Sequence, residues 1–145
     1  MAARTTRTVP AAIAGISTTR MRAVAILTGG AVGALARAAV AKLLPHGAGA
    51  WPWATFSVNL LGALVLAWLT TRLAEMVAPT RYWRFLLGTG FCGALTTFST
   101  LQVETLRLAK DGRPALAAAY AAASIACGMA VAVAATVAAR RRRYG

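Results

Sequence analysis

The sequence is short of acidic residues, with only Glu75, Glu104 and Asp111 among its 145 positions. Charged residues of either sign make up 13% of the chain, whereas a soluble globular domain carries about 25%. Hydrophobic residues make up 59%, so there is too little polar surface to cover a water-facing exterior. These shortages favour a membrane protein over a soluble one.

Histidine and cysteine are also scarce. His46 is the single histidine, and Cys92 and Cys127 show neither CxxC nor Cys/His spacing. The sequence therefore supports no zinc site, no redox pair and no Ser/His/Asp constellation. We expect both cysteines to act as small buried hydrophobes, and we expect the chain not to be an enzyme.

Four apolar stretches are long enough to cross a bilayer, which takes roughly 20 mostly apolar residues. They cover about 23–44, 53–73, 82–108 and 114–139. The connections between them are short, which predicts antiparallel neighbours with both termini on one side. We predict an all-α transmembrane domain over 23–139. A disordered basic N-terminal tail (1–22) and a basic C-terminal tail (140–145) flank it.

The basic residues lie mostly at the ends of these stretches, and the formal net charge is +13. A charge of this size is typical of nucleic-acid binding or of loops that contact anionic lipid headgroups. We favour lipid contact and expect no nucleic acid, because no basic run lies on a foldable soluble module. Lys and Arg number 11 on the terminal side and 5 on the other. The positive-inside rule then places the termini in the cytoplasm.

The third stretch is the most informative, because three glycines and a dense run of hydroxyl residues fall within 88–100. Glycine and β-branched threonine weaken a helix. In hydrocarbon, a helix break exposes carbonyls that line a cavity or coordinate an ion. The alternative is an unbroken helix with a small packing face, whose hydroxyls bond the carbonyls four residues earlier.

Polar residues also interrupt the other three stretches. Thr55 and Asn59 lie one turn apart in the second, and Tyr120 and Ser124 lie one turn apart in the fourth. Asn59 either bonds a neighbouring helix or offers an N–H donor to an anion. Arg37 in the first is a functional candidate because a charge is costly there, unless it snorkels to the interface.

A central carboxylate is missing from all four stretches, since Glu104 lies near the end of the third. A proton-coupled exporter of similar size needs an intramembrane acid to carry protons. The sequence therefore disfavours a small four-span drug or cation exporter, which remains an alternative.

Three motifs together resemble the Fluc (CrcB) family of fluoride channels. They are GGAVGALAR at 29–37, WPWATFSVNLLG at 51–62, and GFCGALTTFST at 90–100 followed by Glu104. They are similar to the family's GGxxGAxxR, PxxTxxVNxxG and GFxGxxTTFSTF…E patterns. Tyr120 and Ser124 fit the family's fourth helix. The TTFST block with the upstream VN is specific, whereas a GxxxG spacing alone is common.

The resemblance implies an antiparallel, dual-topology dimer of four-helix subunits with a broken third helix. Two narrow fluoride paths would run along the subunit interface. A structural sodium ion would lie at the centre, held by backbone carbonyls of the broken helices. On this chain, Gly93 and Thr96 would supply those carbonyls.

The resemblance also implies roles along the fluoride path. Asn59 would meet the ion from a polar vestibule, and Phe98 would present the edge of its ring. Thr55 and Ser124 would fall on a polar track. The remaining pathway candidates are Tyr120, which would pack against the aromatic ring, Arg37 and Leu101.

Leu101 departs from the family pattern, which has a second phenylalanine there. We therefore expect a passive channel that exports cytoplasmic fluoride across the cell membrane as an antiparallel homodimer. The alternative is a non-conducting subunit or one half of a heterodimer with an oppositely oriented paralogue. The unequal charge on the two sides also favours that alternative, because it predicts one fixed orientation.

Overall fold

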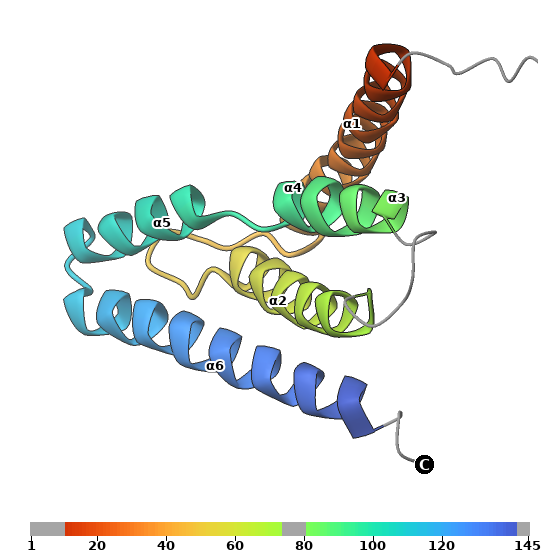
Figure 1. Cartoon of the computed structure of the whole chain (residues 1–145). Coiled ribbons are helices and arrows are strands. Elements are labelled where there is room, and N and C mark those ends of the chain that lie inside the picture. The colour runs from red at the N-terminus through yellow and green to blue at the C-terminus, as the bar shows by residue number, and fades with distance from the viewer. Residues whose placement is uncertain (1–10, 74–80, 142–145) are drawn as a thin grey trace, which may run out of the picture.

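The computed structural model describes residues 11–73 and 81–141 (Figure 1). Within these ranges the chain is helical apart from short connections, and it has no strand. The predictions for residues 1–10, for the connection at 76–80 and for residues 142–145 lie outside the described part. The elements are α1 (Ala11–Leu43), α2 (Trp53–Leu73), α3 (Arg81–Trp83), η1 (Arg84–Cys92), α4 (Gly93–Leu95), α5 (Phe98–Lys110) and α6 (Pro114–Arg141).

Three helices in the described part of the chain are long and apolar enough to cross a bilayer. They cover Thr18–Leu43 of α1, all of α2 and all of α6. Large apolar side chains such as Leu27, Leu35 and Ile125 are exposed along them. A water-soluble protein rarely exposes so much apolar surface, so these faces belong against lipid or another protein.

The first helix begins earlier than the sequence predicts. We expect a disordered tail over 1–22, but α1 already begins at Ala11. Residues 11–22 include three alanines, two arginines and a methionine, which favour a helix, and no proline interrupts them. A helix of 33 residues is about 50 Å long, whereas the hydrocarbon core is about 30 Å thick. Part of α1 therefore extends beyond the membrane.

The segment over 82–108 is divided into pieces in the structure. It comprises the short helix α3, the π-helix η1, the short helix α4 and then α5. Between α4 and α5 the backbone is extended at Thr96 (φ −79°, ψ 152°) and Thr97 (φ −150°, ψ 112°). Figure 1 shows α4 and α5 separated by this extended link. None of the four pieces alone has the roughly 20 residues that a spanning helix needs.

Glycines on α1 allow it to cross η1 in close backbone contact. A Cβ atom at Gly29 would collide with the carbonyl oxygen of Leu86, and one at Gly33 would collide with that of Phe91. From the other side, a Cβ at Gly90 would lie 2.7 Å from the carbonyl oxygen of Ile26. The GxxxG spacing at residues 29–33 is therefore a packing face toward η1.

The remaining helices pack around a small buried core. α2 packs on α6, and α5 packs on the first part of α6. Tyr120 is completely buried there with Leu101, Leu108 and Ala117. The ring of Trp51 meets the ring of Tyr120 edge-on, with centroids 5.3 Å apart. This core fixes the position of α5 against α2 and α6.

The α1–η1 contact predicts different effects for neighbouring glycines. Gly33→Ala should lower stability by about 1–3 kcal/mol, because its methyl group collides with backbone that cannot rotate away. Gly30→Ala is the matched control, since its Cβ would lie 3.9 Å from the carbonyl oxygen of Gly90, an ordinary van der Waals contact. The measurement is the thermal unfolding midpoint of each purified variant in detergent. Equal midpoints for the two variants would contradict the close α1–η1 contact.

Candidate functional site

Asn59 on α2 holds the extended link between α4 and α5. Its Nδ2 donates to the carbonyl oxygen of Thr97 at 3.2 Å, and its Oδ1 accepts from the N–H of Thr97 at 2.8 Å. One side-chain amide thus satisfies both polar groups of one residue. A primary amide has two N–H hydrogens, so Asn59 has one more than this pairing uses. Bonding to a neighbouring segment does not exhaust its donors.

The hydrogen bonds at the link free the carbonyls of Gly93 and Thr96. In a continuous helix these carbonyls would accept from the N–H groups of Thr97 and Thr100, four residues later. The N–H of Thr97 instead bonds Asn59, and that of Thr100 bonds the hydroxyl of Thr97 at 3.2 Å. The carbonyls named in the sequence analysis are therefore the ones whose helical donors have been diverted.

The surroundings of Gly93 and Thr96 leave these backbone groups accessible. Gly93 is exposed, and a Cβ atom placed on it would meet nothing within 4 Å. The hydroxyl of Thr96 donates to the carbonyl oxygen of Cys92 at 2.9 Å, so it is turned back toward its own helix. Gly62 on α2 provides room for the methyl group of Thr96. At Thr96 itself, a ligand would therefore meet backbone oxygen rather than the hydroxyl.

Glu104 on α5 connects this helix to α2 and α6. Its side chain is 8% exposed, and its two oxygens each accept one short hydrogen bond. The hydroxyl of Thr55 donates to Oε1 at 2.7 Å, and that of Tyr120 donates to Oε2 at 2.7 Å. Sequence reasoning assigned Thr55 and Tyr120 to the site but missed their common partner. The signal was available, because Glu104 is the only acid within a predicted span.

Two buried polar atoms near Tyr120 have no hydrogen-bond partner in the described part of the chain. They are Oγ of Ser124, one turn after Tyr120, and Nε1 of Trp51. A buried donor without a partner costs about 1–3 kcal/mol. The Ser124 hydroxyl is therefore a buried donor that the described part of the chain leaves unpaired.

Phe98 and Leu101 lie one turn apart on α5 but differ in burial. Phe98 is 70% exposed at the start of the helix, whereas Leu101 is 9% exposed and packs in the core with Tyr120. The predicted contact of Tyr120 on this helix is therefore made with Leu101, and Phe98 faces outward. Within a single chain, these two pathway candidates do not share a surface.

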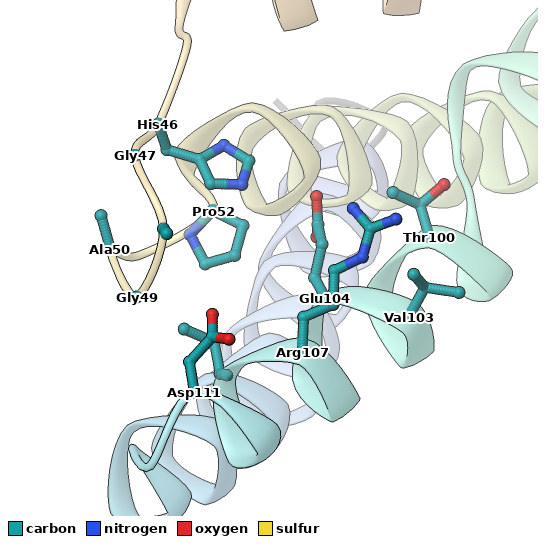
Figure 2. Close-up of a pocket in the computed structure, with 12 residues that line it drawn as sticks. His46, Gly47, Gly49, Ala50, Pro52, Thr100, Val103, Glu104, Arg107 and Asp111 are labelled. Atoms are coloured by element: carbon teal, nitrogen blue, oxygen red, sulfur yellow. The ribbon is translucent and has the colours of Figure 1, made fainter.

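Arg37 lies with other polar residues around a cavity of about 330 Å³. Thr55, Thr97 and Glu104 also line it. A second cavity of about 360 Å³ adjoins Glu104 on the side of the connection between α1 and α2 (Figure 2). The structure therefore groups Arg37 and Thr55 around Glu104, with Asn59 linked to them through Thr97. Gly93 and Phe98 face outward instead.

Comparison with known proteins places these features in a family. The model of the family described as CrcB-like protein, Camphor Resistance (CrcB), matches residues 24–136. A protein named fluoride-specific ion channel FluC 1 from Mycobacterium tuberculosis is 50% identical over 119 residues, covering 82% of this chain and 90% of that protein.

More distant relatives carry similar names. Fluoride-specific ion channel FluC 1 from Streptomyces avermitilis is 45% identical over 109 residues, covering 74% of this chain and 86% of its own length. Fluoride-specific ion channel FluC from Chlorobaculum tepidum is 41% identical over 102 residues, covering 70% and 81% respectively. These matches and its apolar helices identify the chain as a multi-pass membrane protein that belongs to the CrcB-like family.

Proposed function

We propose that this chain forms a fluoride-selective channel that lets fluoride leave the cytoplasm passively, across the cell membrane and without enzymatic chemistry. The names of its relatives support this. The observation that carries the proposal is the exchange of hydrogen bonds at Thr96 and Thr97. There, Oδ1 of Asn59 takes the place of the Gly93 carbonyl as the acceptor for the N–H of Thr97. The carbonyls of Gly93 and Thr96 are then left without helical partners in the middle of a largely apolar protein.

The polar groups near the link suit a small, strongly hydrated anion. A dry path must replace the water around fluoride with N–H and O–H donors. The second Nδ2 hydrogen of Asn59 and the unpartnered hydroxyl of Ser124 are such donors. The exposed ring of Phe98 adds a weakly positive edge. Weak and multiple contacts allow an ion to leave again, which conduction requires.

The carbonyls of Gly93 and Thr96 suit a structural sodium ion. Hard cations prefer oxygen ligands, and rings of backbone carbonyls bind alkali cations in channels. When bound, the cation would supply a fixed positive field favourable to a passing anion. Two carbonyls are too few for a cation site, so a second chain must contribute the rest.

An antiparallel dimer would bring these groups together. Gly93 and Phe98 both face outward from the chain, where a partner could reach them. The three long apolar helices and the divided segment between α2 and α6 would then make four membrane passages. In this arrangement the links of two chains would meet at the centre.

A second candidate is a subunit that works only with an oppositely oriented paralogue. Leu101 favours it, because this position has no aromatic ring and its side chain lies in the core rather than on a surface. The charge difference of 11 basic residues against 5 also favours one fixed orientation. Such a chain could not form an antiparallel dimer with itself.

Efflux from liposomes tests the channel proposal. A fluoride-selective electrode should detect rapid efflux from vesicles containing the purified chain. Asn59→Ala should slow it by at least about tenfold, because a donor to a charged group is lost. Thr70→Ala is the matched control on α2, since the hydroxyl of Thr70 only bonds carbonyls of its own helix. Full efflux from a well-folded Asn59→Ala protein would show that Asn59 only packs between helices and does not contact the ion.

The two positions on α5 should respond differently to substitution. Phe98→Ile should reduce the efflux rate strongly, because it removes an exposed ring edge. Leu101→Ile should lower the free energy of unfolding by less than about 1.5 kcal/mol, which lowers the thermal midpoint slightly. It should leave the efflux rate unchanged. Measuring rate and midpoint for both proteins checks this. Equal rates for the two variants would mean that the aromatic edge is not used.

Orientation in the cell membrane separates the two candidates. A cysteine introduced at Gly145 can be labelled with a membrane-impermeant maleimide in intact and in opened cells. The paralogue-dependent candidate predicts labelling from one side and no efflux from the chain alone. Labelling in both orientations together with robust efflux would reject that candidate and favour the homodimer.

A further inference from the structure

The two cavities beside Glu104 share a wall formed by His46, Thr100 and Glu104. These residues line both the cavity of about 360 Å³ and that of about 330 Å³. Figure 2 shows the ring of His46 and the carboxylate of Glu104 pointing into the same space from different segments. His46 lies in the connection after α1, and Glu104 lies on α5. A movement or a change of charge at His46 therefore acts on both cavities.

The charged groups around the two cavities balance one another when His46 is neutral. Arg37 on α1 and Arg107 on α5 are cationic. Glu104 on α5 and Asp111 at the end of that helix are anionic. Two positive and two negative groups line this space, so among the lining residues the charge of His46 decides the net sign. A further cation, the guanidinium of Arg113 just before α6, lies against Gly49 in the same connection but lines neither cavity. Lys42, at the end of α1, lines neither cavity.

Histidine is the side chain whose charge ordinarily changes between about pH 5 and 8. His46 is exposed, so protons from the solution can reach it. The neighbouring Glu104 carboxylate repels an approaching anion, although its two oxygens are held by Thr55 and Tyr120. An imidazolium on the same wall would offset that repulsion.

We propose that His46 controls the electrostatics of the anion entrance and that its protonation speeds fluoride passage through this end of the protein. The inference rests on the proposed channel function. Protonation changes the rate in both directions and not the direction of net flow. This end lies opposite the chain termini, so it faces the outside if the termini are cytoplasmic. An acidic medium drives more neutral hydrogen fluoride into a cell. The same medium would then also speed the passage of fluoride out of it.

The test compares three proteins at two values of pH. Efflux is measured at about pH 6 and about pH 8, equal on both sides of the vesicles, and the leak from protein-free vesicles is subtracted. A unit charge about 8 Å away in water changes the local concentration of an anion about two- to threefold. The wild type should therefore be about two- to threefold faster at the lower pH. His46→Gln should be slow at both values, and His46→Lys fast at both.

Two controls show whether the effect is electrostatic and local. Raising the ionic strength to about 1 M shortens the screening length to about 3 Å and should bring the wild-type ratio toward one. Lys42→Gln should keep the wild-type ratio, because this residue lies outside both cavities. A His46→Gln protein that keeps the wild-type pH dependence would overturn the inference. Absence of any efflux from the wild type would instead defeat the channel proposal itself.

Discussion

The pairing of Asn59 with Thr97 is the interaction on which the centre of this protein depends. In hydrocarbon every backbone N–H and C=O needs a partner, so a helix can stop there only if other groups take over. Asn59 satisfies both polar groups of Thr97, and the hydroxyl of Thr97 satisfies the N–H of Thr100. These changes of partner give the N–H groups of Thr97 and Thr100 new acceptors. They leave the carbonyls of Gly93 and Thr96 without helical partners. In the proposed function, a cation is the partner of the oxygen atoms released in this way.

The link keeps its position because the helices on either side are held independently. On one side, α1 and η1 approach so closely that only glycine fits at Gly29, Gly33 and Gly90. On the other side, Glu104 binds hydroxyls from α2 and α6, which ties α5 to both. The extended residues therefore lie between two rigid attachments.

The sequence predicts much of this arrangement, because length and hydropathy determine where helices can lie. The bounds of α2 agree with the predicted 53–73, and α6 agrees closely with 114–139. Glycines and threonines at 88–100 indicate a weak point but do not tell which N–H groups change partners. Phe98 and Leu101 lie one turn apart on the same helix, so periodicity could not show that Leu101 is buried while Phe98, the first residue of α5, is exposed. Glu104 was missed as a junction because its donors are 49 and 16 residues away in the chain.

The placement of charge agrees with the proposed passage of an anion. A full positive charge at the narrowest point would hold fluoride too tightly, whereas neutral donors can bind it and release it. Consistent with this, the link is surrounded by amide, hydroxyl and carbonyl groups. The charged residues Arg37, Glu104, Arg107 and Asp111 gather around cavities next to it. In such wider spaces a charge alters the local concentration of an ion without fixing it. A titratable residue can therefore regulate the rate at this position, whereas the same residue at the link would trap the ion or leave a costly buried charge.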